Sequence, residues 1–330
     1  MKATARARPN IALVKYWGKR DSTLNLPAAG SLSVTLDTLW TQTTVAFDRT
    51  LEHDALRLNG AVDACAGTRV SACLDVLRQH AGIAWRARVD TQNNFPTAAG
   101  LASSASGFAA LVMAASQALD LPLDRKFLST LARQGSGSAA RSLYGGFVAM
   151  YAGQLADGSD AFAEPLLPPQ DWPLTVVIAI TTQQAKAVGS GEGMERSRRT
   201  SPFHANWIAS VDDDLAAARS AVMAHDFEAL AEVGEHSCLK MHADMLSSRP
   251  PLMYWSAATM ACMQRIRELR GRDGLGVFFT VDAGPQVKAV CLPQDAPRVA
   301  AALAEVPGVE CTMVSGLGAG AEILPEVEVA

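Results

Sequence analysis

Polar and apolar residues alternate along the first part of the chain in a pattern typical of β-strands. Residues 5–16 alternate well enough for one strand, which Pro9 confines to a sheet edge or a bulge because proline donates no backbone hydrogen bond. Further strands are expected at 32–36, 41–47, 55–58 and 84–89. The strand at 55–58 ends at Asn59-Gly60, a dipeptide that favours a tight β-hairpin.

Later segments place apolar residues at the spacing of amphipathic helices. The first of them, 68–79, carries Val70, Cys73, Leu74 and Leu77 on one face. Other helices are expected at 103–119, 124–133, 205–223, 226–245, 255–270 and 297–305, and buried strands at 174–180, 276–281 and 287–292. We interpret the aliphatic, Met, Ala and Trp positions of the long helices as core.

Composition narrows the class of protein. A chain of 330 residues with 49% hydrophobic residues can form one large domain or two lobes with a sizeable core. The net charge of −4 gives no general attraction to nucleic acid or an acidic membrane, and no apolar run of about 20 residues is present. Six scattered cysteines without a C-x-x-C pair predict reduced thiols in a cytoplasmic protein. The six histidines show no zinc spacing, so we assign no metal ligands.

The segment before the helix at 103–119 is rich in small residues. It reads Asn94-Phe95-Pro96-Thr97-Ala98-Ala99-Gly100-Leu101-Ala102-Ser103-Ser104-Ala105-Ser106-Gly107. Small residues let a ligand approach the backbone, and the serine hydroxyls lie at a helix start, where free amides favour an anion. On local grounds a serine-capped helix after a glycine turn is the simpler explanation, and no lysine follows the glycine as in a Walker A loop.

Two lysines lie close together near the N-terminus. They occur in the string Asn10-Ile11-Ala12-Leu13-Val14-Lys15-Tyr16-Trp17-Gly18-Lys19-Arg20. Lys15 and Lys19 are four residues apart, so on a strand both point to the same side and can reach one anion. An ordinary strand with a cationic outer face is the alternative interpretation.

Two further Gly/Ser loops lie later in the chain. Residues 134–147 combine such a loop with a short helix that presents Arg141, and arginine grips a carboxylate best through a bidentate fork. A helix connection with a solvated arginine is the alternative. Residues 188–194 form the other loop and open a basic helix.

An aspartate, Asp282, ends the buried strand at 276–281 and begins the sequence Asp-Ala-Gly-Pro. On local grounds this aspartate is an ordinary turn residue. Taken together, three Gly/Ser loops, one arginine and one aspartate suggest a site for several anionic groups. ATP with a small phosphorylated acid would supply such groups.

These motifs carry a resemblance to a known family. The pattern Pro-x-x-x-Gly-Leu-Ala-Ser-Ser-Ala resembles the phosphate-binding motif of the GHMP kinase superfamily. The strings around Lys15, Arg141 and Asp282 are similar to those of the diphosphomevalonate decarboxylases, and the resemblance runs from Asn10 to about Gly320. It implies an α+β, two-lobed GHMP kinase fold around a deep cleft. The N-terminal, ATP-binding lobe, 1–182, would be ribosomal-protein-S5-domain-2-like, and the C-terminal lobe, 183–330, ferredoxin-like.

The resemblance also implies a reaction and roles for individual residues. The reaction is ATP-dependent decarboxylation of mevalonate 5-diphosphate to isopentenyl diphosphate in isoprenoid biosynthesis, with Mg²⁺, in a cytoplasmic homodimer. The implied catalytic residues are Asp282, Lys15 and Arg141. The implied substrate-binding residues are Tyr16, Lys19, Ser136, Ser138, Arg141 and Ser190. The implied ATP-binding residues are Asn94, Pro96, Gly100, Ala102, Ser103, Ser104 and Ser106.

The chain departs from this family at several positions, which leaves alternatives open. Gly191 stands where many bacterial relatives have Arg, and Arg196 or Arg198 is the candidate to compensate. Gly189 replaces a usual Ser; the other departures are Gln286, Ala29 and Gly30. The first alternative is a relative that acts on mevalonate 5-phosphate or another 3-hydroxy acid. A non-catalytic sensor and a kinase that stops after phosphorylation are the others.

Overall fold

The computed structural model describes residues 1–330 apart from 63, 96–102, 123, 185 and 326–330. In the described part the chain forms one six-stranded sheet, two four-stranded sheets and a two-stranded ribbon, all flanked by helices. The architecture is therefore a mixed α/β arrangement with several separate sheets.

The six-stranded sheet has the order β16-β1-β6-β9-β7-β8. Its strands are β1 (Lys2–Ala7), β6 (Thr41–Asp48), β7 (Ala55–Leu58), β8 (Ala61–Val62), β9 (Arg86–Asn93) and β16 (Glu322–Leu324). Alternate residues of β6 are buried, so one face of the sheet packs in a core with α1 (Ala64–Ala81), α2 (Ser103–Ala118) and α3 (Arg125–Gly135). The alanine-rich α2 packs directly against β1 and β6.

The first four-stranded sheet has the order β11-β10-β5-β2. Its strands are β2 (Asn10–Val14), β5 (Ser31–Thr35), β10 (Phe147–Met150) and β11 (Ala163–Leu167). The 3₁₀ helix η1 (Gly137–Leu143) contacts this sheet, as do α6 (Val211–Ala224) and α7 (Phe227–Leu246). Because helices cover it, β2, β5 and β10 are buried along their whole length.

The structure corrects the single strand predicted at 5–16. The chain leaves the six-stranded sheet after Ala7 and enters the β2 sheet at Asn10, so Pro9 lies at a switch between two sheets. The carbonyl of Pro9 accepts a hydrogen bond from the backbone N–H of Leu36 at 3.0 Å. Apolar and polar residues keep alternating through the switch, which is why the sequence indicates one strand.

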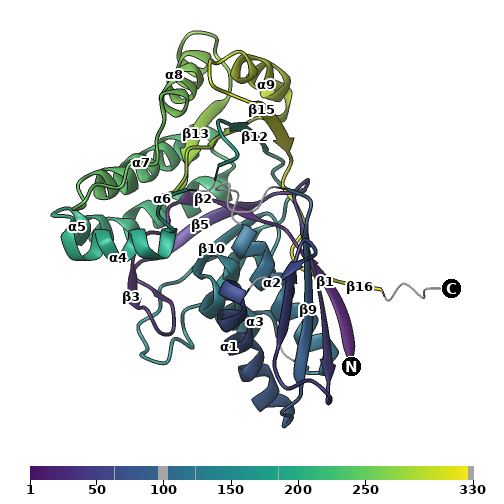
Figure 1. Ribbon diagram of the computed structural model, residues 1–330. Coiled ribbons are helices and arrows are strands. Elements are labelled where there is room, and N and C mark those ends of the chain that lie inside the picture. Colours follow the sequence, from purple (N-terminus) through teal and green to yellow (C-terminus); the bar gives the residue numbers. More distant parts are fainter. Residues whose placement is uncertain (63, 96–102, 123, 185, 326–330) are drawn as a thin grey trace.

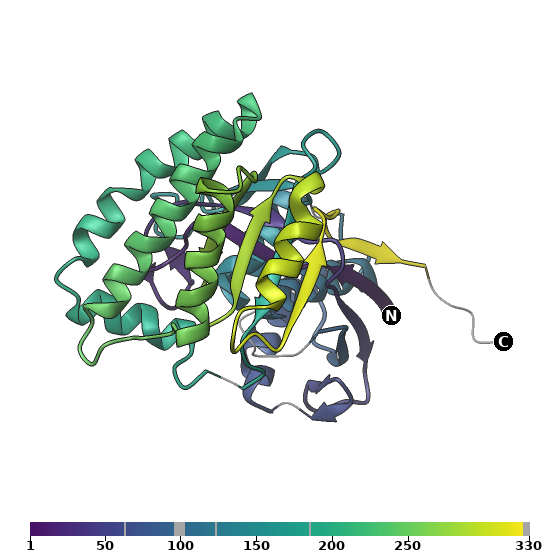
Figure 2. The same ribbon diagram turned by 90° about the horizontal axis from the view of Figure 1, so that it is seen from above.

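The second four-stranded sheet has the order β13-β14-β12-β15 and is antiparallel throughout. Its strands are β12 (Thr175–Ile180), β13 (Val277–Val281), β14 (Val287–Cys291) and β15 (Cys311–Ser315). The helices α8 (Ala257–Gly271) and α9 (Ala296–Ala304) pack on it, and Figure 2 shows α9 in yellow across its strands. Helix α7 contacts both β13 and β2 and so links the two four-stranded sheets.

The predicted division of the chain into 1–182 and 183–330 stays a prediction. Strand β12 precedes this boundary, yet it pairs with β14 and β15, which follow it. Strand β16 returns from the C-terminal part to pair with β1. Each part of the chain therefore adds a strand to a sheet built mainly by the other.

The structure corrects the helix predicted at 205–223, whereas most others are confirmed within a few residues. That segment holds α5 (His204–Ala209) and α6, which meet at Ser210. The predicted basic helix is α4 (Ser190–Thr200), and the predicted Asn59-Gly60 hairpin joins β7 to β8. Two short elements, β3 (Lys19–Asp21) and β4 (Leu26–Pro27), pair in a ribbon, and η2 (Pro293–Asp295) precedes α9.

The helices gather in two groups. Figure 1 shows α1, α2 and α3 beside β1 and β9, while α4 to α9 lie at the other end of the molecule. No helix in the described ranges is both long and apolar enough to cross a membrane. The strands β2 and β5 lie between the two groups, so residues at their ends can meet side chains from either one.

Candidate active site

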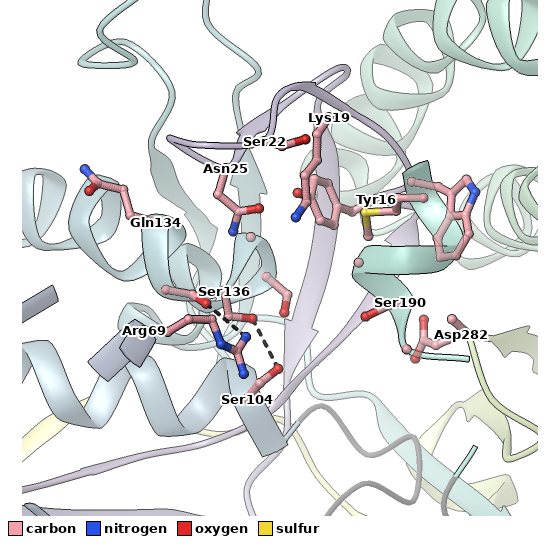
Figure 3. A pocket seen from close by; sticks show the side chains of 18 of the residues that line it. Tyr16, Lys19, Ser22, Asn25, Arg69, Ser104, Gln134, Ser136, Ser190 and Asp282 are labelled. Atoms are coloured by element: carbon pink, nitrogen blue, oxygen red, sulfur yellow. Dashed lines mark hydrogen bonds between the residues drawn. The ribbon is translucent and has the colours of Figure 1, made fainter. Parts of the chain in front are cut away.

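Described residues from all three Gly/Ser segments line one cavity of about 720 Å³. A cavity of this size lies within the usual range for small-molecule sites. Figure 3 shows Lys19 at its upper edge, Arg69 and Ser104 below, and Ser190 and Asp282 on the right. The predicted site residues that line it are Lys15, Tyr16, Lys19, Ser103, Ser104, Ser136, Ser138, Arg141, Ser190 and Asp282.

Asp282 lies between two buried lysines in this cavity. The Nζ of Lys15 is 2.5 Å from Oδ1 of Asp282, and the Nζ of Lys288 is 3.2 Å from Oδ2. Burial by itself opposes ionisation of the carboxyl, but the charges and hydrogen bonds of both lysines outweigh it and lower the pKa of Asp282. The side chain is 27% exposed, so a ligand can reach a carboxylate that is ionised at neutral pH.

Two buried strands bring Asp282 and Lys15 together from positions 267 residues apart. Asp282 follows β13 directly, and Lys15 follows β2 directly. The backbone N–H of Lys15 donates to Oγ of the buried Ser237 on α7 at 3.0 Å. Because every residue of both strands is buried, the two side chains are fixed by the cores on which they rest.

Two polar side chains accept hydrogen bonds from the guanidinium of Arg141. Its Nε donates to Oδ1 of Asn10 at 3.2 Å, and its Nη1 donates to Oγ of Ser31 at 2.6 Å. No hydrogen bond joins its Nη2 to any residue in the described part of the chain. Burial lowers the pKa of Arg141 to about 10, partly offset by Tyr16 and Asp282, so the guanidinium stays charged at neutral pH. It is therefore a rigid cation that lines the cavity.

Tyr16 packs against the loop that carries Ser136 and Ser138. A Cβ on Gly137 would lie 2.3 Å from the Tyr16 hydroxyl oxygen, so only glycine fits beside the ring. Burial raises the pKa of Tyr16 to about 12, with Arg141 opposing it, so the phenol stays protonated. Its buried hydroxyl has no hydrogen-bond partner within the described residues and can bond a ligand.

Trp17 anchors the backbone between Tyr16 and Lys19. Its Nε1 donates to Oγ of Ser197 on α4 at 3.0 Å, and its carbonyl accepts from Nε1 of Trp207 on α5 at 2.6 Å. Burial, with Arg69 next in size, lowers the pKa of Lys19, whereas Glu195 raises it. The Lys19 end of the cavity is therefore attached to both α4 and α5.

The first two Gly/Ser loops are joined at the start of α2. The Oγ atoms of Ser104 and Ser136 are 3.2 Å apart, as the dashed line in Figure 3 marks. Arg69 on α1 lies beside them, where its Nη1 donates to the carbonyl of Gly135 at 3.4 Å. Its guanidinium also lies 5.4 Å from the ring centroid of Phe108. This end of the cavity therefore combines hydroxyls, a helix N-terminus and a cation.

A smaller cavity of about 190 Å³ adjoins this end. It shares Arg69, Ser103 and Ser104 with the larger cavity. Its other residues are mostly apolar: Leu56, Leu58, Val70, Val89, Thr91, Asn93, Gly107, Phe108 and Leu111. The smaller cavity therefore forms a mostly apolar recess next to the polar donors of the larger one.

Two predicted ATP-binding residues do not line either cavity. Ser106 is fully buried, and its hydroxyl bonds the hydroxyl of Thr41 at 2.6 Å. Asn94 accepts from the backbone N–H of Trp40 at 2.7 Å and donates to the carbonyl of Thr38 at 2.8 Å. Both side chains thus serve the surrounding fold. The predicted residues Pro96, Gly100 and Ala102 lie outside the described residues.

Three cations at the site were not predicted: Arg69, Lys186 and Lys288. Lys186 lines the cavity, and its Nζ donates to the carbonyl of Ala283 at 2.8 Å. Lys288 could have been found, because a lysine inside the otherwise apolar strand Val287–Cys291 is unusual. Arg69 belongs to no motif and occupies an exposed position of α1, so no comparable signal marks it.

The departures from the family pattern have local explanations. Arg196 pairs with Glu192 at 2.7 Å and Arg198 with Glu195 at 2.7 Å, so both predicted substitutes for a cation at 191 are already paired. A Cβ on Gly191 would lie 3.9 Å from Nζ of Lys19.

Two of the other departures, Gln286 and Gly30, lie in packed surroundings. The buried Gln286 accepts from the backbone N–H of Thr181 and donates to the carbonyl of Thr182, each at 2.6 Å. A Cβ on Gly30 would lie 2.6 Å from Cδ2 of Leu215, so α6 occupies the space beside it. Both positions therefore serve packing in this chain.

Two family models match consecutive parts of the chain. The diphosphomevalonate decarboxylase-like N-terminal domain matches residues 7–163, and the mevalonate 5-diphosphate decarboxylase C-terminal domain matches residues 176–316. The chain is 40% identical to diphosphomevalonate decarboxylase of Aspergillus fumigatus over 326 residues, 93% of this chain and 81% of that protein. It is 40% identical to the Candida albicans enzyme over 298 residues, 86% of this chain and 82% of that one.

Solved structures give the same result. The mevalonate diphosphate decarboxylase of Staphylococcus aureus superposes with a TM-score of 0.92 at 40% identity and covers 98% of both chains. The Enterococcus faecalis enzyme reaches 0.89 at 39% identity, with 99% of both chains covered. A further structure, solved in complex with MVAPP, AMPPCP and magnesium, superposes with a TM-score of 0.91 at 40% identity and covers 99% of both chains. The predicted two-lobed GHMP kinase fold is confirmed, and this chain belongs to the diphosphomevalonate decarboxylase family.

Proposed function

We propose that this protein catalyses the ATP-dependent decarboxylation of mevalonate 5-diphosphate to isopentenyl diphosphate, ADP, phosphate and CO₂. The observation that carries the proposal is the Lys15–Asp282 ion pair at 2.5 Å in the cavity that Arg141 also lines. An ionised carboxylate and a fixed guanidinium are what a substrate with one hydroxyl and one carboxylate requires.

In the first step the C3 hydroxyl of the substrate attacks the γ-phosphorus of ATP, and ADP leaves. Asp282 orients this hydroxyl and accepts its proton. A carboxylate with a low pKa is a weak base, but phosphoryl transfer has a loose transition state, in which catalysis rests mainly on positioning and charge stabilisation. Lys15 pairs with Oδ1 of Asp282 at 2.5 Å and helps to keep the carboxylate ionised.

In the second step phosphate departs from C3 with the C–O electron pair. The C1–C2 pair then becomes the C2–C3 double bond as CO₂ leaves. Arg141 binds the departing carboxylate through the edge that Asn10 and Ser31 leave open. Because the guanidinium stays protonated in the neutral range and does not transfer its proton to the carboxylate, the carboxylate remains an anion and can release its electron pair.

ATP fits the end of the site that contains Arg69, Ser103 and Ser104. We place its phosphates at the start of α2 and its base in the adjoining apolar cavity of about 190 Å³. Mg²⁺ bound with ATP beside Ser103 and Ser104 would supply positive charge that offsets the charge of the phosphates during transfer. Among the described residues no group of three His, Cys, Asp or Glu side chains could hold a metal ion.

The substrate's 5-diphosphate fits the opposite end, beside Tyr16, Lys19 and Ser190. Gly191 adds no side chain there, and this favours the second candidate, a decarboxylase that acts on mevalonate 5-phosphate. We retain the diphosphate because a protonated phenol, a cation and a hydroxyl remain available to it.

A coupled assay tests the substrate assignment. ADP release is measured with mevalonate, its 5-phosphate and its 5-diphosphate, and the products are identified by mass. ADP and isopentenyl diphosphate in equal amounts support the proposal. ADP without CO₂ would identify a kinase, and binding without ADP release would identify a sensor.

Gly191→Arg is expected to increase the preference for the diphosphate over the monophosphate by roughly 10-fold. The new guanidinium would extend from a Cβ 3.9 Å from Lys19 Nζ, and a charge-assisted contact to phosphate stabilises by about 1.5–3 kcal/mol. The gain should appear in KM for the diphosphate, because the contact is remote from C3. The ratio of kcat/KM for the two substrates measures it. Gly191→Gln, which adds a long polar side chain without the charge, is the control. An unchanged ratio in Gly191→Arg would show that position 191 does not face the phosphates.

Gly137→Ala is expected to raise KM for the substrate by about 10-fold. The added methyl would lie 2.3 Å from the Tyr16 hydroxyl, so the ring must move away from the position it now holds. Gly271→Ala at the end of α8 is the matched control, because its Cβ meets nothing within 4 Å and the residue lines neither cavity. Steady-state kinetics with unchanged thermal unfolding would support the role of Tyr16, and an unchanged KM would contradict it.

We also propose that the protein works as a cytoplasmic homodimer. The free thiols of Cys73, Cys238, Cys262 and Cys291 are buried, which suits a reducing compartment. Light scattering coupled to size-exclusion chromatography tests the dimer. A monomer at working concentrations would exclude it.

A further inference from the structure

Lys288 is a charged residue inside a buried apolar strand. It lies in β14, of which every residue is buried, and it is 0% exposed. Its Nζ is 3.2 Å from Oδ2 of Asp282 and donates to the carbonyl of Gln286 at 3.3 Å. Burying an ammonium group is costly unless the group is paired, so this position needs an explanation.

Neutralising Asp282 does not require a second lysine. Lys15 already pairs with Oδ1 at 2.5 Å and is itself buried. What Lys288 adds is a contact to the other oxygen, from a strand next to β13 in the sheet. With one lysine on each oxygen, the carboxylate cannot turn about its Cβ–Cγ bond without breaking a charged contact.

We propose that Lys288 is a positioning residue for the reaction: it holds Oδ2 of Asp282 while Lys15 holds Oδ1, and so keeps the carboxylate directed into the cavity. The inference rests on the proposed role of Asp282. It assigns no contact between Lys288 and the substrate, because the lysine is fully enclosed. The effect passes through Asp282 alone.

The charged and titratable groups around Asp282 allow this effect to be read from a pH profile. They are Lys15, Lys186, Lys288, Arg141, Cys238 and His242. Burial lowers the pKa of His242 to about 3 and raises the pKa of Cys238, so both are neutral between pH 4 and pH 8. The pKa of Asp282 is also lowered, so Asp282 stays ionised over this range in the wild-type protein. The phosphates of substrate and ATP titrate alike with either protein, so an acidic limb that only the Lys288 variants show would report the protonation of Asp282.

The direction of the change follows from the charges. Burial raises the pKa of Asp282, while Lys15 and Lys288 lower it below the usual carboxyl value. Removing one of the two cations leaves the cost of burial and weakens the attraction that opposes it, so the pKa of Asp282 must rise. We therefore expect the acidic limb of activity to lie at a higher pH in the Lys288 variants than in the wild-type protein.

Lys288→Met and Lys288→Gln test the proposal, with Thr280→Val as the control. Met matches the length of lysine without its charge, and Gln serves if the Met variant does not fold. Thr280 is buried on β13 directly opposite Lys288, so its replacement disturbs the same layer without changing charge. We expect kcat to fall about 10–100-fold in the Lys288 variants, with KM for ATP unchanged and the acidic limb moved upward. Thr280→Val should keep the wild-type pH profile.

A double variant separates this inference from the role of Asp282. If Lys288 acts through Asp282, adding Lys288→Met to Asp282→Asn should change kcat by less than about 2-fold. A further loss equal to that of the single variant would overturn the inference, as would an unmoved acidic limb in both Lys288 variants. Full turnover in Asp282→Asn alone would contradict the proposed role of Asp282, whatever the Lys288 variants show. The two failures are therefore distinguishable.

Discussion

Asp282→Asn is expected to lower turnover by about 10²–10⁴-fold while leaving the affinity for ATP nearly unchanged. Asparagine keeps the shape of the side chain but removes both the proton acceptor and the negative charge. The predicted ATP end of the site, around Ser104 and Arg69, lies away from Asp282 in Figure 3, which is why nucleotide binding should persist. The loss should thus appear in kcat.

Stability has to be measured beside activity for this variant. Asp282 provides the counter-charge for Lys15 and Lys288, both buried, and removing one partner of such a pair typically costs about 3–5 kcal/mol. Turnover should be compared below the thermal midpoint of the variant, with nucleotide binding followed by calorimetry. Near wild-type turnover in the folded variant would remove Asp282 from the mechanism.

Arg141→Lys is expected to raise KM for the substrate and lower kcat, with a combined loss of about 10²-fold or more in kcat/KM. Lysine keeps the charge but cannot donate to Asn10 and Ser31 while also presenting two parallel N–H groups to a carboxylate. The substrate would bind less tightly and with its C1–C2 bond less well directed.

The matched control for this variant is Arg133→Lys. Arg133 is also fully buried, but it lies outside the large cavity, where Nη1 donates to the carbonyl of Leu24 at 2.9 Å. Its replacement should lower the thermal midpoint and leave KM close to the wild-type value. If Arg141→Lys behaves in the same way, Arg141 supports the fold and does not bind the carboxylate.

The sequence predicts the parts of the site that lie within continuous motifs. Ser104, Ser136, Arg141 and Asp282 each belong to a short string whose local geometry sets the direction of the side chain, and all four line one cavity. Ser106 belongs to the same string as Ser104 but lies on a different face of α2. There its hydroxyl is hydrogen-bonded to the hydroxyl of Thr41. A string of hydroxyls therefore does not show which of them faces a ligand.

Features that depend on distant partners could not be predicted. The switch at Pro9 depends on which strand each segment pairs with, and alternation alone carries no such information. The break at Ser210 falls inside an apolar pattern that continues across it, because α5 and α6 both pack against α7. The proposed role of Lys288 depends on its ion pair with Asp282. The sequence indicates only that Asp282 lies in a turn six residues earlier.

The 267-residue separation between Lys15 and Asp282 has a consequence for synthesis of the chain. Lys15 leaves the ribosome early, yet its counter-charge emerges only after most of the chain has been translated. Until then the β2 segment ends in a lysine that cannot be enclosed without the cost of an unpaired buried charge, about 3–5 kcal/mol. The nascent N-terminal part must therefore keep this strand end hydrated, and the core around β2 closes only when β13 arrives.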